Sequence, residues 1–107
     1  MADINALFAK LSASYLEAVP DKLLQLRQLI ESATHESAAI TELAEFAHQL
    51  AGSAGTFALP ELGEQARVLL DKVRQIQGKG RVFSTDERDE FEALVDTMET
   101  TTLLRSC

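Results

Sequence analysis

The sequence predicts an all-α domain, an up-down antiparallel four-helix bundle with a short extra N-terminal helix. Apolar residues recur at spacings of three and four through most of the chain, which is the period of a buried helix face. Short segments separate these runs, and short connections favour antiparallel neighbouring helices. No stretch alternates with a period of two for long enough to predict a sheet. A length of 107 residues fits one domain, 1–107, with a single core.

The first two predicted helices meet near Pro20. A short helix is expected to begin at about Asp3, and its apolar residues are Ile4, Leu7, Phe8 and Leu11. Pro20 should either kink that helix or open the next one at its first position. The apolar face of the second helix is Leu23, Leu26, Leu29, Ile30 and Ala33.

Three further helices follow, each with a recognisable boundary. The third runs from about residue 37 to Phe57, and its core face is Ile40, Leu43, Ala47, Leu50, Ala54 and Phe57. Pro60 opens the fourth, whose inner face is Leu62, Ala66, Leu69, Val73 and Ile76. The glycines of residues 78–80 end it. The last helix opens with the capping-box spacing of residues 84–87, and its apolar residues are Phe91, Leu94, Val95 and Met98.

His48 lies on the third predicted helix but off its apolar face. At about 100° per residue it sits roughly 130° from the centre of that face, so its imidazole should point toward water or a shallow groove. The residues on its side of the helix are small: Ala44, Ala51, Gly52 and Gly55. Each glycine inside a helix costs about 0.5–1 kcal/mol relative to alanine. Access for a partner protein explains Gly52 well, and a notch for close helix packing is the alternative.

Residues 47–58 read Ala-His-Gln-Leu-Ala-Gly-Ser-Ala-Gly-Thr-Phe-Ala, and Leu62 follows. This stretch resembles the motif of histidine-containing phosphotransfer (HPt) domains of multistep two-component phosphorelays. That motif reads Ala-His-x-Leu-Lys-Gly-Ser-Ala-Gly-x-Phe/Leu-Gly, with a leucine four residues later. A looser resemblance covers residues 15–20 and the helix spacing of the whole chain. The chain departs from the motif at Ala51, where the family has lysine, and at Ala58, where it has glycine.

The resemblance implies that His48 is phosphorylated, receiving its phosphoryl group from a receiver-domain aspartate and passing it to another receiver aspartate. It makes the chain a phosphoryl carrier without an ATP site rather than an enzyme. Its partners would be response-regulator receiver domains, including that of a hybrid sensor kinase. No cofactor is expected on this chain, because Mg²⁺ would be held by the receiver. The residues expected to shape the site are Gln49, Ala51, Gly52 and Gly55.

Arg67 is the candidate for supplying the positive charge that the absent lysine would bring. If the two helices form an antiparallel hairpin centred near residues 57–58, Arg67 lies level with His48. Each of the two follows a core alanine, so both side chains should leave the core face. A guanidinium offers a planar fork of donors that suits phosphate oxygens. The alternative is an ordinary surface arginine paired one turn away with Glu64 or Asp71.

Composition excludes several other functions. A net charge of −7 argues against a nucleic-acid partner and against contact with an anionic membrane. The apolar runs are too short to span a bilayer. Cys107 is the only cysteine, so no internal disulfide can form, which favours a location in the cytoplasm. The chain would act there either as a separate protein or as the cytosolic C-terminal domain of a membrane-bound hybrid kinase. Two histidines thirteen residues apart do not predict a metal site, and His35 is expected in an exposed loop.

Two other hypotheses remain open at this stage. The first is an adaptor of the same fold that binds receivers without being phosphorylated, and only Ala51 favours it. The second is an unrelated helical bundle that serves as an adaptor or dimerisation module, with the His48 motif a coincidence.

Overall fold

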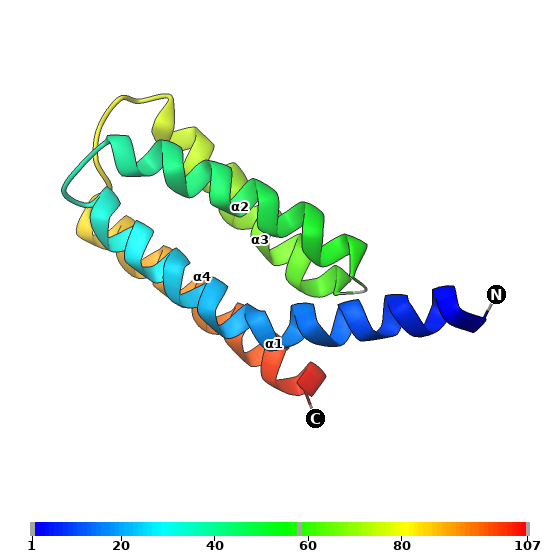
Figure 1. The fold of residues 1–107 in the computed structure, drawn as a ribbon. Coiled ribbons are helices and arrows are strands. Elements are labelled where there is room, and N and C mark those ends of the chain that lie inside the picture. The colour runs from blue at the N-terminus through cyan, green and yellow to red at the C-terminus, as the bar shows by residue number, and fades with distance from the viewer. Residues whose placement is uncertain (1, 58, 107) are drawn as a thin grey trace.

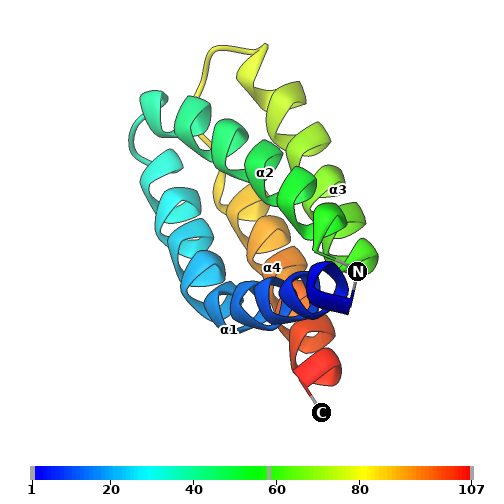
Figure 2. The ribbon, with the colours of Figure 1, turned by 45° about the vertical axis from the view of Figure 1, so that its right-hand side comes forward.

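The chain folds into four helices packed side by side. The computed structural model describes residues 2–57 and 59–106, and the helices within them are α1 (Ala2–Ala33), α2 (Ala38–Thr56), α3 (Pro60–Gln77) and α4 (Thr85–Ser106). Helices α1 and α3 each pack against both α2 and α4, and successive helices run in opposite directions (Figures 1 and 2). No strand occurs in these residues. The predicted all-α fold class is therefore confirmed, while Ala58 and Cys107 lie outside the described residues.

The expected short N-terminal helix is not a separate element. Residues 2–33 form one helix, and Pro20 lies inside it. Of the two outcomes predicted for Pro20, the kink is the one observed, because α1 changes direction where its colour passes from dark to light blue (Figure 1). The helix continues across the proline, and Val19 and Leu23, both buried, extend its core face on either side. A proline inside a helix removes one hydrogen bond and bends the helix.

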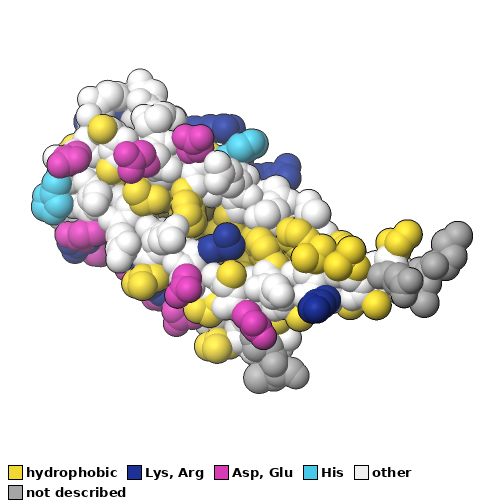
Figure 3. Space-filling view, viewed as in Figure 1, with side chains coloured by type: hydrophobic (Ala, Val, Ile, Leu, Met, Phe, Trp, Pro, Cys, Tyr) yellow, Lys and Arg dark blue, Asp and Glu magenta, His cyan; other side chains and the backbone are white. Residues whose placement is uncertain are grey.

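The core lies between the four helices and uses the predicted apolar faces. Every residue predicted for the inner face of α3 is buried, as are the predicted α2 residues apart from half-buried Phe57. The four apolar residues of the first predicted helix behave differently, because this part of α1 projects beyond the bundle. They are exposed, with Ile4 at 70% and Phe8 at 45%. Figure 3 shows the apolar surface as a band that reaches toward this projecting end.

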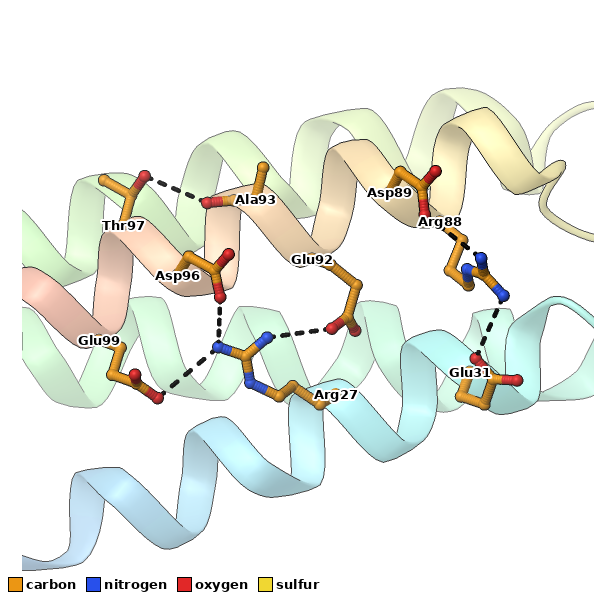
Figure 4. A network of polar contacts seen from close by, with 9 residues as sticks. All are labelled: Arg27, Glu31, Arg88, Asp89, Glu92, Ala93, Asp96, Thr97 and Glu99. Carbon is orange, nitrogen blue, oxygen red and sulfur yellow. Dashed lines mark hydrogen bonds and ion pairs between the residues drawn. The ribbon is translucent and has the colours of Figure 1, made fainter.

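Arg27 ties α1 to α4 on the face shown in Figure 4. Its guanidinium lies 3.0 Å from a carboxylate oxygen of Glu92, 2.7 Å from one of Asp96 and 3.6 Å from one of Glu99. These acids lie at i, i+4 and i+7 on α4 and repel one another. Although each exposed ion pair contributes little, one cation shared by three carboxylates offsets that repulsion and holds the two helices together.

The predicted capping box is present at the start of α4. The backbone N–H of Glu87 donates to Ser84 Oγ at 3.2 Å, and the N–H of Ser84 donates to Glu87 Oε1 at 2.8 Å. The Arg81 guanidinium also donates to both carboxylate oxygens of Glu87, at 2.7 and 2.9 Å. The hydrogen bonds from Arg81, followed by that from the Ser84 backbone, lower the pKa of Glu87 from its ordinary 4.5 to about 2.

We expect Glu87→Gln to lower stability at neutral pH and to remove part of the acid sensitivity of the fold. A lowered folded-state pKa means that ionised Glu87 contributes its full stability above pH 4.5 and loses it as the pH falls toward 2. The Glu87 side chain is 22% exposed, so solvent screening reduces the expected contribution to about 1 kcal/mol. Urea denaturation at pH 6 and pH 2.5 measures it, with exposed Asp86→Asn as the control. The same loss of stability on acidification in the wild type and in Glu87→Gln would contradict this prediction.

Candidate functional site

His48 lies near the middle of α2 with its side chain at the surface. It is exposed, whereas Ala47 before it and Leu50 two residues later are buried. Among the described residues its ring forms no hydrogen bond or ion pair. The imidazole therefore stands on a rigid helix with its nitrogens open to solvent. Ala44, which the helical period placed on the same side, is buried instead, because α2 contacts both α1 and α3.

A surface hollow of about 320 Å³ opens beside His48 between α2 and α3. Its wall on α2 consists of His48, Ala51 and Gly52, and its wall on α3 consists of Arg67, Leu70, Asp71 and Arg74. Successive turns of each helix contribute these residues, at spacings of three or four that begin at His48 on α2 and at Arg67 on α3, so each set forms one stripe along its helix. The structure thus brings predicted site residues from two helices to one open depression.

Two contacts show how α2 lies against α3 in the hairpin. The Gln77 side-chain amide donates to Thr41 Oγ1 at 3.2 Å. Counting along the antiparallel helices from this pair places His48 opposite residue 70, and counting from the close approach of Gly63 to the Ala51 carbonyl places it opposite residue 66, so Arg67 lies within the segment facing His48. After α2 ends at Thr56, the Leu59 N–H bonds back to the Ala54 carbonyl at 2.8 Å and closes the turn into α3. Arg67 lines the hollow, on the side nearer the hairpin.

Gly63 permits the close approach of α3 to the motif. A Cβ at this buried position would lie 3.2 Å from the Ala51 carbonyl oxygen and 3.5 Å from the Gly55 nitrogen. By contrast, a Cβ at Gly52 or at Gly55 would meet nothing within 4 Å. The sequence reasoning missed Gly63, although its place beside the core residue Leu62 was a usable signal. Within the described structure, the packing of α3 against α2 therefore favours glycine at position 63, whereas a side chain at Gly52 or Gly55 would enter open space.

Tyr15 holds α1 against the opposite side of the motif. Its hydroxyl lies 2.6 Å from Ser53 Oγ, and Ser53 Oγ lies 2.9 Å from the Gln49 carbonyl oxygen. Because the serine donates its one hydrogen to that carbonyl, the tyrosine is the donor of the first bond. Burial raises the pKa of Tyr15 above its ordinary 10.0, so the hydroxyl stays protonated. The ring also stacks on Phe57 at 5.1 Å between centroids.

Two of the residues expected to shape the site lie outside the hollow beside His48. Gln49 faces the α1 side of α2, where it lines a separate hollow of about 230 Å³ with Tyr15, Lys22 and Phe46. Gly55 is exposed near the end of α2 and lines neither hollow. The reason is the 100° step between successive helical residues, which turns Gln49 away from the side of its neighbour His48.

The hollow beside His48 contains two arginines that form no ion pair. In the part of the chain that the structure describes, neither Arg67 nor Arg74 forms an ion pair, so the pairing of Arg67 with an acidic neighbour on α3 does not occur. A larger hollow of about 670 Å³ on the α1–α4 face contains Arg27 and Arg88. Both of those arginines are bound by carboxylates. The sequence reasoning missed Arg74, which lies seven residues after Arg67 on the same helical stripe.

Residues 2–57 and 59–106 contain no group of three His, Cys, Asp or Glu side chains placed to hold a metal ion. In the same residues no helix has the length and apolar character needed to cross a membrane.

Comparison with known protein families gave one match. A family model described as "Hpt domain" matches residues 10–101, which is most of the chain and includes α2, α3 and the hollow between them. Comparisons with curated proteins and with solved structures gave no match.

Proposed function

The chain belongs to the Hpt domain family, and from this premise we propose that His48 is the residue that carries the phosphoryl group. Hpt domains transfer phosphoryl groups through a histidine in phosphorelays, interact there with receiver domains and act as phosphocarrier modules. The observation that carries the assignment is the exposure of His48 beside a hollow with two unpaired arginines. The other histidine, His35, lies in the connection between α1 and α2, 3.4 Å from a Glu31 oxygen.

The proposed reaction begins at an aspartyl phosphate on a receiver domain. A lone pair of neutral imidazole attacks the phosphorus, the bond from phosphorus to the aspartyl oxygen breaks, and the receiver regains its carboxylate. Attack by a second receiver aspartate reverses these bond changes and frees His48. Such transfers depend mainly on in-line positioning and on charge stabilisation. The receiver supplies Mg²⁺, so this chain needs no cofactor of its own.

The contribution of this chain is an imidazole held on a rigid helix with an unobstructed approach. Ala51 and Gly52 present little side-chain bulk beside His48. The bond from Tyr15 to Ser53 and the close contact at Gly63 brace α2 on either side. The proposed setting is the cytoplasm, with the receiver of a hybrid sensor kinase or a separate response regulator as the partner.

A receiver-binding adaptor that is not phosphorylated is the second candidate, because Ala51 leaves the site without the family's lysine. One experiment separates the two. The protein is incubated with receiver domains from the same genome that have been phosphorylated on aspartate. A carrier gains an acid-labile, base-stable phosphate. A complex with a receiver without such a phosphate would favour the adaptor, and neither complex nor label would overturn both.

We expect Arg67→Ala to slow phosphoryl transfer by about threefold to tenfold without lowering stability. An exposed side chain with no ion pair contributes little to folding, whereas a guanidinium beside a phosphoryl group stabilises its charge. Rapid-quench kinetics with a phosphorylated receiver measure the effect, and urea denaturation measures stability. Lys79→Ala, which removes the same charge beyond the end of α3, is the matched control. Equal rates for wild type and Arg67→Ala would make Arg67 an ordinary surface residue.

A further inference from the structure

The α3 wall of the hollow carries charges of both signs. Arg67, Asp71 and Arg74 lie at i, i+4 and i+7, and all three line the hollow together with His48. We call these three residues the α3 charge row. Asp71 lies about one turn after Arg67 on α3, and Arg74 lies about one turn farther along. The site therefore faces two cations and one anion rather than the single lysine of the family motif.

Asp71 is the unexpected member of this row. Carboxylates three or four residues from an arginine on a helix commonly pair with it, yet among the described residues Asp71 pairs with neither Arg67 nor Arg74. It is exposed and has no hydrogen bond that would give it a structural role there. A phosphoryl group on His48 would bring a charge of about −2 to this hollow.

We propose that Asp71 and Arg74 set how firmly His48 holds its phosphoryl group, with Arg74 stabilising the phosphorylated state and Asp71 destabilising it. This rests on the proposed phosphorylation of His48. A carrier must release what it accepts, and a site with cations alone would favour retention over onward transfer. Asp71 opposes retention in two ways, since it repels the phosphoryl dianion directly and also competes with it for the neighbouring guanidiniums. Both residues act through the field at the phosphoryl oxygens, so they are positioning residues and not nucleophiles.

Phosphorus NMR of the phosphorylated protein tests the proposal. The whole chain carrying His35→Gln, in which His48 is the remaining histidine, is loaded with phosphoramidate, which requires no receiver, and the resonance of the phosphoryl group is followed against pH. A neighbouring cation favours the dianion, so Arg74→Gln should move the second ionisation of this group to higher pH. Removing a neighbouring anion has the opposite sign, so Asp71→Asn should move it to lower pH. Each ionisation constant should change by about twofold to fivefold.

Matched controls separate this effect from a change in net charge or in folding. Asp86→Asn and Lys79→Gln make the same charge changes away from the hollow, and they should leave the titration unchanged. The shifts should shrink in 1 M salt, because a field between exposed groups is screened whereas a structural change is not. With a phosphorylated receiver as donor, Asp71→Asn should also raise the equilibrium share of label on His48.

The outcomes distinguish a failure of the proposed function from a failure of the role of the α3 charge row. Failure of the wild type to form phosphohistidine would overturn the proposed function. Formation of phosphohistidine with a titration that neither variant moves, or that both move in the same direction, would overturn the role of the α3 charge row and leave the proposed function standing.

Discussion

Replacing His48 with glutamine should abolish phosphoryl transfer and leave the four helices intact. Glutamine has no nucleophilic nitrogen that can carry a phosphoryl group. The imidazole is exposed and forms no hydrogen bond in the described residues, so its loss should change the free energy of unfolding by less than about 0.5 kcal/mol. Labelling from a phosphorylated receiver measures transfer, and circular dichroism with urea denaturation measures the fold.

The second histidine provides the control for this variant. His35 is also exposed, and its ring lies 3.4 Å from a carboxylate oxygen of Glu31 on the preceding turn of α1. His35→Gln should keep full labelling. Undiminished labelling of His48→Gln would remove the basis of the proposed function, and loss of helical structure in that variant would show that His48 has a structural role that its exposure does not explain.

Replacing Gly52 with glutamine should block transfer of the phosphoryl group from a receiver while leaving His48 reactive toward a small donor. A side chain at this position meets no atom of the domain within 4 Å of its Cβ, and glutamine has a higher helix propensity than glycine, so stability should be unchanged or slightly raised. The added side chain would occupy the hollow beside His48, where the receiver must approach. We expect transfer to fall by more than about tenfold, which a docking penalty of 1.4 kcal/mol produces.

The chemical donor separates access from reactivity in this variant. Phosphoramidate is small, so it should still phosphorylate Gly52→Gln at nearly the wild-type rate. Gly78→Gln introduces the same side chain at an exposed position past the end of α3, where the contacts of a Cβ are ordinary, and it should transfer normally. Normal transfer from a receiver by a stable Gly52→Gln protein would refute the argument that Gly52 provides access.

The sequence predicted most of the fold because each helix carries its own local signal. The period of apolar residues located the buried faces of α2 and α3, and Pro60 and the capping box of Ser84 and Glu87 located two helix starts. The same period placed His48 off the core, and the structure agrees. These features depend on residues near one another in the chain, which is why sequence reasoning reached them.

Features that depend on how helices meet were beyond the same reasoning. The offset of α2 against α3 depends on the turn after Thr56 and on the close approach at Gly63, and the period of apolar residues predicts neither. The continuity of α1 through Pro20 depends on packing against α2 and α4. Asp71 and Arg74 line the hollow beside His48 because α3 packs against α2.

The most direct test of the central claim is to locate the phosphoryl group. After reaction with a phosphorylated receiver, the protein is digested at neutral to alkaline pH and its peptides are sequenced by mass spectrometry with electron-transfer fragmentation, which preserves phosphohistidine. The account predicts a single phosphorylated residue, His48, and an unmodified peptide containing His35. Phosphate on His35, on a carboxylate or on a hydroxyl residue, with His48 unmodified, would contradict it.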